Sequence, residues 1–378
     1  MTDSYLPAYI KSQNRRVVLD LFRRHGVLTR ASICTHTGMS FPTAIKIIDF
    51  LMAKGIVQET ADRPNGSAPG RKGKLLRFNP EAYRAIGLLF EGQYACVGLV
   101  NMNGDLIEQA AMNVAWRDGL PDLKEAAALI RQMCERNQQS PILGVGIGFP
   151  GIIDPDSASI VQYYNMGLNE SRSFAELFPD FTGAVGLPYF LENDVNLACV
   201  GELFRRRQQG EVNDLVYLSL GTGLGGGIVL DGTLRRGARG RTGEVGEMLT
   251  ELPQTGLPPR RMEQVVNLNA IRQRFGIDIH RAMPLDEESR AGIADYLAGP
   301  LTLLMANLSV ALDVPDFVLA GIVPEVLGDV LYRRLNAGFE AAGLPGTRVS
   351  PPVNPCPGIT GGAATVFDNA IFDVLSGD

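Results

Sequence analysis

A glycine-rich run, LGTGLGGGIVLDG, extends from Leu220 to Gly232, and five of its six glycines lie together with one threonine between two apolar segments. The backbone N–H groups of such a loop can hold phosphate groups, as they do in many nucleotide-binding proteins. Phosphoryl transfer is therefore the first chemistry that the sequence suggests, although it also requires a magnesium ion and a base for the accepting hydroxyl group. The alternative is that the glycines only allow a tight turn between two strands.

Asn193 and Asp194 form a second candidate site, because they end the predicted strand LPYFLEND and precede the predicted helix VNLACVGELF. Ligands bind at the carboxyl ends of the strands in open α/β sheets. An amide and a carboxylate side by side can bind neighbouring hydroxyl groups, and the negative charge strengthens these hydrogen bonds. The same pair can instead cap the following helix, and one residue can do both.

The other reactive side chains form no catalytic or metal-binding pattern. The five cysteines are scattered, odd in number and never spaced as C-x-x-C, which is typical of reduced cytosolic thiols. The three histidines lie apart from the candidate sites, and none is placed for triad chemistry. The arginine run Arg205–Arg207 ends a predicted helix, where we expect a solvated charge cluster.

These candidate sites lie in a region of alternating strands and helices that begins at about Pro80. The segment AIGLLFEGQYACVGLVNMNGDLIEQAAM predicts consecutive strands with turns at Glu91-Gly92 and Asn103-Gly104. A helix is predicted from about Leu120 to Gln138, and the buried strand ILGVGIGFPGIID follows it. Further along, LAGPLTLLMANLSVALD predicts a long apolar helix, DFVLAG a strand, and GITGGAATVFDNAIFDVL a final helix that begins with glycines.

Three helices are predicted before this region. The first ends at Gly26, the second is capped by Thr29 and ends at Gly38, and the third is capped by Ser40 and ends at Lys54-Gly55. We expect the buried face of the first helix to carry Val17, Val18, Leu21 and Phe22. Two helices joined by a tight glycine turn, with small polar residues at the start of the second, are typical of a helix-turn-helix.

Two predicted strands, Ile56–Thr60 and Lys74–Asn79, complete the pattern of a winged helix. The cationic loop between them suits contact with a DNA backbone or a minor groove, and the start of the third helix suits the major groove. The residues that we expect to contact DNA are Ser40, Phe41, Thr43 and Lys46 in the helix and Arg63, Arg71 and Lys72 in the loop. The alternative is that this unit mediates protein contacts.

The charge of the chain divides at the same boundary. Residues 1–80 contain 13 Lys and Arg against 5 Asp and Glu, a net charge of +8, whereas the other residues contain 22 and 36, a net charge of −14. A basic segment on an acidic body favours a polyanionic partner over a merely solvated basic face. No run of about 18 apolar residues and no signal-peptide core is found, so we expect a cytoplasmic protein with no membrane partner.

The order and spacing of four motifs, together with the predicted winged helix, resemble the ROK family of repressors, uncharacterised reading frames and sugar kinases. The motifs are Gly148-Phe149-Pro150-Gly151, Glu192-Asn193-Asp194, Leu220–Gly227 and Gly243-Glu244-Val245-Gly246. The resemblance covers nearly the whole chain, and within the family it is to repressors of the xylose and N-acetylglucosamine type. It implies an α/β fold of two lobes, the actin-like ATPase (ribonuclease-H-like) fold of sugar kinases, with a sugar in the cleft between the lobes.

The resemblance also implies a division of the chain into domains. We expect a winged helix-turn-helix domain at residues 1–79, a first α/β lobe at 80–195 and a second α/β lobe at 196–359. The C-terminal helix at 360–378 is expected to return to the first lobe.

The chain departs from the kinases of this family at the first phosphate-binding turn. Kinases carry D-x-G-G-T there, whereas this chain has Leu89 in place of the aspartate and Glu91 in place of a glycine. Leucine cannot organise a magnesium ion, and a carboxylate repels nucleotide phosphates. We therefore expect no catalytic residue and no cofactor.

The sugar-binding side of the site agrees better with the family. The resemblance implies sugar-binding roles for Asn193, Asp194 and Glu244, and it places Gly151 and Asn165 in loops that close on the sugar. Many members also have a histidine followed by a cysteine-rich zinc loop, but this chain has Glu247 at that position and no cysteine downstream, so we expect no metal. Glu247 could accept a hydrogen bond from a hydroxyl, pair with an amino group, or be an exposed loop acid.

The sequence thus predicts a DNA-binding transcriptional regulator, more plausibly a repressor, that senses a sugar in the cleft. Its expected partners are operator DNA, a sugar effector and further copies of itself in a homodimer or tetramer. One alternative is a sugar kinase with a DNA-binding head. Another is a regulator that has lost its sugar ligand and responds to a protein partner.

Overall fold

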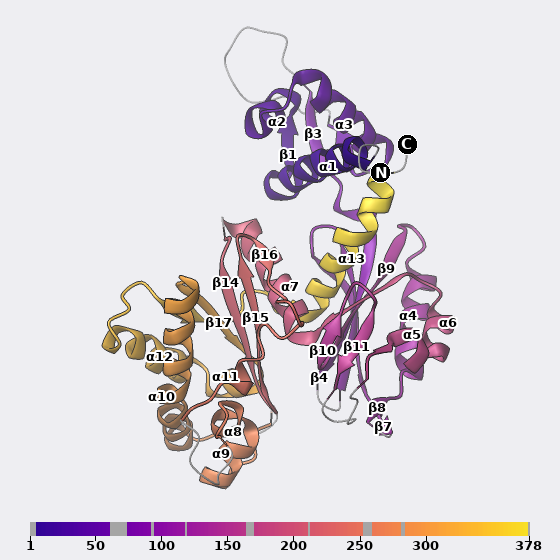
Figure 1. The fold of residues 1–378 in the computed structure, drawn as a ribbon. Coiled ribbons are helices and arrows are strands. Elements are labelled where there is room, and N and C mark those ends of the chain that lie inside the picture. The colour runs from indigo at the N-terminus through magenta and orange to yellow at the C-terminus, as the bar shows by residue number, and fades with distance from the viewer. Residues whose placement is uncertain are drawn as a thin grey trace.

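The protein folds into a small head above a body of two lobes (Figure 1). The structure, a computed structural model, describes residues 5–60, 74–91, 94–117, 119–163, 170–210, 212–251, 259–280 and 284–376. The N-terminal residues form the head, and the C-terminal helix extends from the first lobe up to it.

The head consists of three helices and a three-stranded antiparallel sheet with the order β1-β3-β2. Its elements are α1 (Tyr5–His25), β1 (Val27–Thr29), α2 (Arg30–Thr37), α3 (Phe41–Ala53), β2 (Val57–Glu59) and β3 (Leu75–Phe78). Thr29 forms a capping box with Ser32 at the start of α2, and Gly38 ends this helix in a left-handed conformation. The predicted ends of α2 are therefore confirmed, and α3 begins after Ser40 and ends before Lys54 as predicted, but the Ser40 side chain makes no capping hydrogen bond.

Two details of the head differ from the prediction. Strand β1 was not anticipated, because its three residues are too few to give a periodic signal. Val17 is 45% exposed and does not share the buried face of α1 with Val18 and Phe22, since a helix with 3.6 residues per turn rotates adjacent side chains by about 100°.

The first lobe is built on a five-stranded mixed sheet with the order β13-β9-β4-β5-β6. Strands β4, β9 and β13 run parallel, whereas β4, β5 and β6 form the predicted antiparallel meander. The strands are β4 (Arg84–Glu91), β5 (Tyr94–Asn101), β6 (Leu106–Asn113), β9 (Ile142–Phe149) and β13 (Tyr189–Asn193). Helix α4 (Lys124–Arg136) packs on one face of this sheet and α13 (Pro357–Ser376) packs on the other.

Short elements complete the first lobe and its connections. They are the 3₁₀ helix Pro80–Ala82, β7 (Trp116–Arg117), β8 (Leu120–Pro121), β10 (Ile152–Asp154), β11 (Ser159–Gln162), β12 (Arg172–Ser173), α5 (Phe174–Leu177) and α6 (Pro179–Val185). The helix predicted from about Leu120 begins only at Lys124, because residues 120–121 pair with β7 as a small hairpin.

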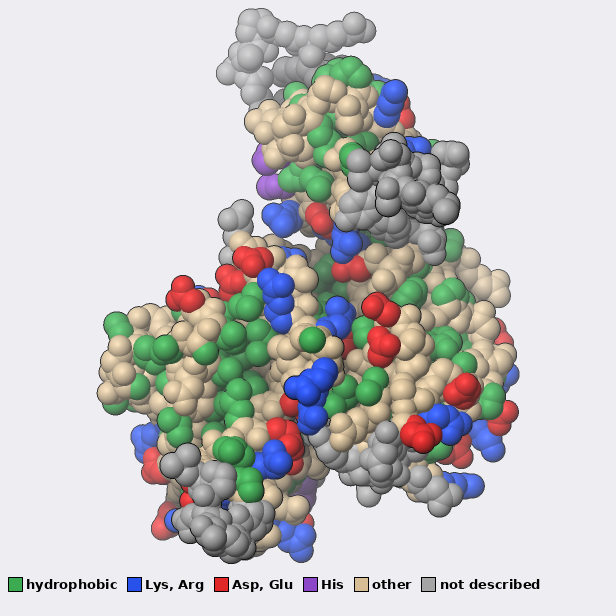
Figure 2. Space-filling model, viewed as in Figure 1, with side chains coloured by type: hydrophobic (Ala, Val, Ile, Leu, Met, Phe, Trp, Pro, Cys, Tyr) green, Lys and Arg blue, Asp and Glu red, His purple; other side chains and the backbone are tan. Residues whose placement is uncertain are grey.

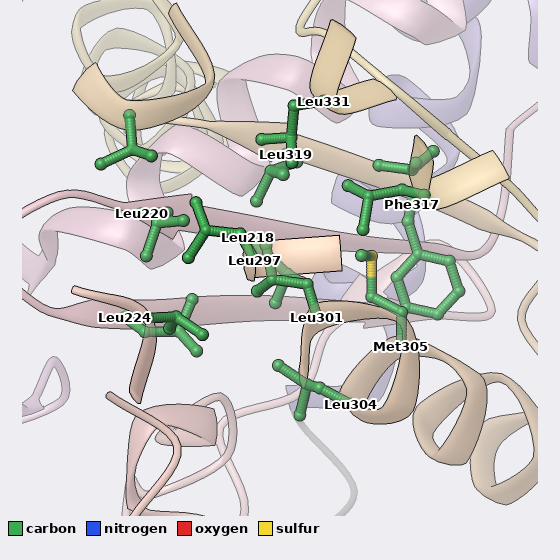
Figure 3. Packing of buried hydrophobic residues seen from close by; sticks show 14 of the residues in the cluster. Leu218, Leu220, Leu224, Leu297, Leu301, Leu304, Met305, Phe317, Leu319 and Leu331 are labelled. Carbon is green, nitrogen blue, oxygen red and sulfur yellow. The ribbon is translucent and has the colours of Figure 1, made fainter. Parts of the chain in front are cut away.

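The second lobe contains another five-stranded sheet, with the order β16-β15-β14-β17-β18, covered by helices. Its elements are β14 (Leu215–Leu220), β15 (Leu224–Leu230), β16 (Thr233–Leu234), the 3₁₀ helix Val245–Glu247, α8 (Glu263–Val266), α9 (Leu268–Phe275), α10 (Glu287–Leu312), β17 (Asp316–Ala320), α11 (Ile322–Leu327), α12 (Asp329–Ala341) and β18 (Arg348–Ser350). Leucines of β14 and β17 meet Leu297, Leu301 and Met305 of α10 in its core (Figure 3).

Helix α10 is long and apolar enough to cross a membrane by length and composition alone. Its buried side chains, among them Leu301 and Met305, belong to the core of the second lobe. This packing is typical of the core helix of a globular domain, so its apolar composition is explained without a membrane.

Helix α7 (Asp194–Gln209) lies between the lobes and packs against α13, β14 and β15. Glycines allow this close packing: a Cβ at Gly361 would overlap the carbonyl oxygen of Leu197, and a Cβ at Gly227 would overlap Cys199. The arginines at the end of α7 are not solvated as predicted. Arg206 pairs with the buried Glu202, and Arg207 donates to the carbonyl oxygens of Val212 and Gly232.

Candidate functional site

Asn193 and Asp194 lie at the carboxyl end of β13 and the start of α7, facing the second lobe. The Asn193 side chain caps α7, because its Oδ1 accepts a hydrogen bond from the Asn196 N–H at 3.0 Å. Its Nδ2 donates to the carbonyl oxygen of Gly151 at 3.0 Å. Asn193 is therefore a helix cap, as the alternative interpretation held, and its amide is already engaged by the protein.

Gly151 is held against Asn193 by this hydrogen bond and has a φ of +115°. A Cβ at this position would lie 2.5 Å from the carbonyl oxygen of Gln162. A glycine is thus required for the chain to turn here after β9. The structure brings Gly151 and Asn193 together, whereas Asn165 lies outside the described residues.

Glu244 lies in an electrostatically unfavourable place for a carboxylate. Burial raises the pKa of Glu244, and the negative charges of Asp194, Glu247 and Glu263 raise it further, while Arg241 opposes them. Asp194, from the end of the first lobe's sheet, therefore faces an acidic group of side chains from the second lobe. Such a group can accept hydrogen bonds from hydroxyl groups and, when protonated at Glu244, can also donate one.

Glu247 pairs with a cation and is not a free loop acid. Its carboxylate accepts a hydrogen bond from Nη1 of Arg261, which also donates to the Glu247 carbonyl oxygen at 3.2 Å. Beside this pair, the Met262 N–H donates to the Met248 carbonyl oxygen at 2.8 Å and the Thr250 N–H to that of Arg260 at 3.0 Å. The ion pair and these backbone bonds join the two ends of the segment at 252–258, which lies outside the described residues.

Glu192 and Arg236 are additional residues of the site that sequence reasoning did not assign. Glu192 is 2% exposed and accepts hydrogen bonds from the Asn193 N–H, from Nδ2 of Asn196 and from Nε of Arg236 at 2.6 Å. Since β13 carries Glu192 and the segment after β16 carries Arg236, this ion pair connects the two lobes at the cleft. The glutamate was visible in the Glu192-Asn193-Asp194 motif, but no local pattern identifies its distant partner.

Leu89 occupies the end of β4 where a kinase of this fold would need an acidic group. Its side chain lies against Gly148 and Gly358, since a Cβ at Gly148 would come within 2.7 Å of Leu89 Cδ1 and a Cβ at Gly358 would overlap Cδ2. An apolar side chain therefore packs at this end of β4, between Gly148 of β9 and Gly358 of α13. The side chain of Glu91 lies outside the described residues.

The glycines that follow Leu220 are needed for a different structural reason from the predicted tight turn. None of Gly221, Gly223, Gly225, Gly226 and Gly227 has a positive φ, so the turn itself does not require glycine. Instead, a Cβ at Gly225 would lie 2.9 Å from Val195, and Gly227 lies directly against Cys199. Gly225 and Gly227 thus allow β15 to lie against α7.

The exposed start of α3 is the second candidate site. Ser40, Phe41 and Lys46 are exposed, with Phe41 at 51%, while Thr43 is half-buried. Ser40 Oγ and Thr43 Oγ1 lie 2.9 Å apart, and the side chain of Ser40 makes no capping bond to the helix backbone. The hydroxyl groups are thus arranged at an accessible helix start. The predicted loop contacts Arg63, Arg71 and Lys72 lie outside the described residues.

Metal ligation finds no support among the described residues, where no three His, Cys, Asp or Glu side chains are placed to hold an ion. Asp194 Oδ1 accepts a hydrogen bond from the Val195 N–H, and Arg241 is the cation that acts on Glu244.

Comparisons with known proteins agree with this architecture. The ROK family model matches residues 92–337. A xylose repressor of Caldicellulosiruptor bescii is 32% identical over 241 residues, which are 63% of this chain and 58% of that protein. A glucokinase of Halalkalibacterium halodurans is 26% identical over 291 residues, 69% of this chain and 86% of that protein.

Among solved structures, a ROK family transcriptional regulator that is a homologue of the E. coli Mlc protein superposes with a TM-score of 0.74 at 19% identity. The match covers 97% of this chain and 98% of that one. This chain belongs to the ROK family, and the predicted α/β fold of two sugar-kinase-like lobes is confirmed. Its relatives include both repressors and sugar kinases.

Proposed function

We propose that this chain is a sugar-responsive transcriptional repressor of carbohydrate metabolism and not an enzyme. The observation that carries this proposal is Leu89, whose apolar side chain lies against Gly148 and Gly358 where a kinase must bind phosphates and magnesium. A site with Leu89 at this position can still bind a sugar through the carboxylates of Asp194 and Glu244. The relatedness to a xylose repressor supports the same conclusion.

In this proposal the sugar binds between Asp194 of the first lobe and Glu244 of the second. Asn193 and Gly151 position the first side of the site, and Glu247, fixed by Arg261, borders the second. The Glu192–Arg236 ion pair keeps the lobes in register at the cleft. Asn165 remains a predicted contact from the adjoining loop.

The head is proposed to bind operator DNA with the start of α3 in the major groove. Ser40, Phe41, Thr43 and Lys46 would face the base edges. Arg63, Arg71 and Lys72 are the proposed contacts from the loop. Sugar binding would close the lobes and shift the paired heads of a dimer, so that operator affinity falls.

We further propose that the protein is cytoplasmic and acts as a homodimer, or as a tetramer built from dimers. The domain limits that we propose are 1–79 for the head, 80–195 with 360–378 for the first lobe, and 196–359 for the second. The exposed face of α10 and α12 is the proposed surface for the second copy, because Leu303 and Val310 are 51% and 73% exposed there.

A sugar kinase with a DNA-binding head is the second candidate. The observation that favours it is the relatedness to a glucokinase across 86% of that protein. The two candidates differ in one measurable product, since a kinase releases ADP when a sugar and ATP are supplied and a repressor does not.

The test measures thermal unfolding, ADP release and DNA binding of the full chain. Thermal unfolding with D-xylose, D-glucose and N-acetylglucosamine is expected to show a higher midpoint with at least one sugar, since a ligand that binds only the folded state stabilises it. An ADP-release assay with the same sugars is expected to show no turnover, and robust turnover would establish the kinase.

DNA binding is tested with a duplex that the protein selects from random sequences. Arg71→Ala combined with Lys72→Ala is expected to weaken binding to all duplexes and to reduce its salt dependence, whereas Thr43→Ala is expected to change the preferred sequence. If no sugar raises the unfolding midpoint and Asp194→Ala leaves the response in cells intact, the regulator instead answers to a protein partner.

A further inference from the structure

The head is joined to the body through a continuous apolar contact. One hydrophobic cluster contains Val18, Leu19 and Phe22 of α1 together with Val366 and Phe367 of α13. Helix α1 contacts both α7 and α13. Figure 1 shows α13 extending from the first lobe to the head. The head therefore has a defined position on the body.

The covalent connection between head and body is short and held on both sides. Nδ2 of Asn79 donates to the Gly55 carbonyl oxygen at 2.9 Å, and Glu81 accepts from Arg84 at 2.7 Å and from Asn101 at 2.7 Å. The Met102 N–H donates to the Pro80 carbonyl oxygen at 3.0 Å. The head cannot change its position unless the contact of α1 with α7 and α13 also changes.

Helix α7 connects this contact with the cleft. It begins at the Asn193 cap beside Asp194, and its 16 residues extend about 24 Å to the underside of the head. The overlap that any side chain at Gly201 or Gly361 would cause shows that α7 and α13 touch backbone to backbone. A displacement of α7 therefore displaces α13, which carries part of the head's apolar support.

Charged side chains gather where α7 and α13 meet α1, and Figure 2 shows basic and acidic groups side by side between the head and the lobes. The charged side chains of Asp20, Arg23 and Arg207 lie here with the rings of Phe204 and Phe367. We call these five residues the neck cluster. Arg207 connects α7 to the second lobe through the Gly232 and Val212 carbonyl oxygens, both at 3.1 Å. Burial lowers the pKa of Arg207, as does the nearby charge of Arg24, while Asp20 and Asp368 oppose this.

Arg23 is the incompletely satisfied member of the neck cluster. Its side chain is 9% exposed, and Nη1 forms a 3.3 Å ion pair with Asp20, while the charge of Arg23 also acts on Asp368 of α13. Its guanidinium carbon lies 5.8 Å from the centre of the Phe204 ring and 6.0 Å from that of Phe367. Among the described residues, none accepts a hydrogen bond from its buried Nε or Nη2. A buried charge without its hydrogen bonds weakens the contact that surrounds it.

We propose that α7 and α13 transmit closure of the cleft to the head, and that Arg23 keeps the docked head only weakly favoured so that sugar binding can change its position. This inference rests on the proposed sugar-responsive function. A fully apolar neck would hold the head rigidly, and a flexible linker would not pass any displacement on. In this proposal the apolar contact holds the docked position, and the incompletely hydrogen-bonded arginine lowers its stability, so that a second position of the head becomes accessible.

The test measures amide hydrogen exchange in α1 and α13 of the full chain. Arg23→Met keeps the aliphatic part of the side chain and removes the guanidinium. We expect exchange in α1 to become about tenfold slower, which corresponds to about 1.4 kcal/mol in the free energy of opening. Lys11→Met is the matched control, because Lys11 is an exposed cation of the same helix about three turns away from Arg23, and it is expected to leave exchange unchanged.

The second measurement adds a sugar that raises the unfolding midpoint of the unmodified protein, chosen from D-xylose, D-glucose and N-acetylglucosamine. Sugar is expected to change α1 exchange in the unmodified protein and not in Arg23→Met, although both bind it. Phe204→Ala, which opens the neck from the α7 side, is expected to speed α1 exchange and also to abolish the sugar effect.

Two results would overturn the inference. One is that neither Arg23→Met nor Phe204→Ala changes amide exchange in α1. The other is that sugar changes α1 exchange in Arg23→Met as much as in the unmodified protein. If no sugar raises the unfolding midpoint at all, the proposed sugar response has failed. The sugar-free comparison of Arg23→Met with Lys11→Met still decides whether Arg23 weakens the neck.

Discussion

At the scale of single residues, the cleft is defined by carboxylates that lie closer together than charged groups favour. The pKa of Glu244 is raised, because this carboxyl group is partly buried and faces Asp194, Glu247 and Glu263. The fold accepts this arrangement although a raised pKa of an acid lowers stability once the unfolded chain ionises. Unfavourable electrostatics that persist at a cleft are typical of a binding function.

Substitution of Glu244 tests this directly. Because the folded pKa of Glu244 lies above its ordinary value of 4.5, the unmodified protein loses stability as pH rises from 4.5 through the folded pKa. Glu244→Gln does not titrate, so we expect its unfolding midpoint to exceed that of the unmodified protein increasingly over this range and to keep the difference at pH 7. Thermal unfolding between pH 4 and 8 measures it.

The control for this experiment is Glu340→Gln, which removes an exposed carboxylate of α12. Its midpoint is expected to differ from that of the unmodified protein by the same amount at every pH. A pH-independent difference for Glu244→Gln as well would show that the cleft does not hold this acid in its protonated form.

Sequence reasoning found the residues of the cleft that belong to contiguous motifs and missed those that depend on a distant partner. Asn193 and Gly151 were predicted, and their mutual hydrogen bond follows from the parallel pairing of β13 with β9. Arg236 lies 44 residues from Glu192 in an irregular segment, and no periodicity predicts their ion pair. The pairing of Glu247 with Arg261 was likewise hidden, because it spans a loop with no repeating pattern.

At the scale of elements, periodicity and capping signals predicted most helices and strands, but they did not give the reason for the glycines. The run after Leu220 was expected to form a tight turn, whereas its glycines admit the approach of β15 to α7. Those at the start of α13 serve the same purpose against α7 and β4. A sequence shows that side chains are missing, and only the assembled fold shows which neighbour fills the space.

This packing predicts the effect of a single methyl group. Gly361→Ala places a Cβ on the carbonyl oxygen of Leu197 and is expected to lower the free energy of unfolding by about 1–3 kcal/mol, because neither helix backbone can yield easily. Gly183→Ala is the matched control in α6, where a Cβ meets nothing within 4 Å. It is expected to raise stability by about 0.5–1 kcal/mol.

Urea unfolding followed by circular dichroism compares the two variants. If Gly361→Ala were as stable as Gly183→Ala, the backbones of α7 and α13 would not be in direct contact at Leu197.

At the scale of the whole molecule, the cleft, the neck and the head follow one another along α7. The cleft lies at the beginning of this helix and the head rests on its end, so a change between the lobes reaches the head through packed elements. A single head, however, binds only one half-site of an operator. A change in the distance between heads therefore alters operator affinity only when two heads are held together in a dimer. The mode of regulation that we propose therefore depends on a dimer.

The groove between α10 and α12 is the surface on which we expect the second copy to pack. It has a volume of about 380 Å³, and small side chains, Leu303 and Arg334 line it. Arg334 forms an ion pair with Asp295 beside the apolar face, which leaves Leu303 as the large accessible side chain of the groove. Leu303→Arg introduces a charge there without touching the core, because the buried side chains of α10 lie on its opposite face.

Leu303→Arg is expected to convert the dimer into monomers with an unchanged unfolding midpoint and unchanged sugar binding, as measured by light scattering after size-exclusion chromatography. Operator affinity should then fall to that of a single half-site, because one head makes roughly half of the contacts. Tyr94→Arg, a matched change at a 60% exposed residue of the first lobe, should leave the dimer intact. A dimer that survives Leu303→Arg and dissociates with Tyr94→Arg would place the interface on the first lobe, beside the β4–β5 turn.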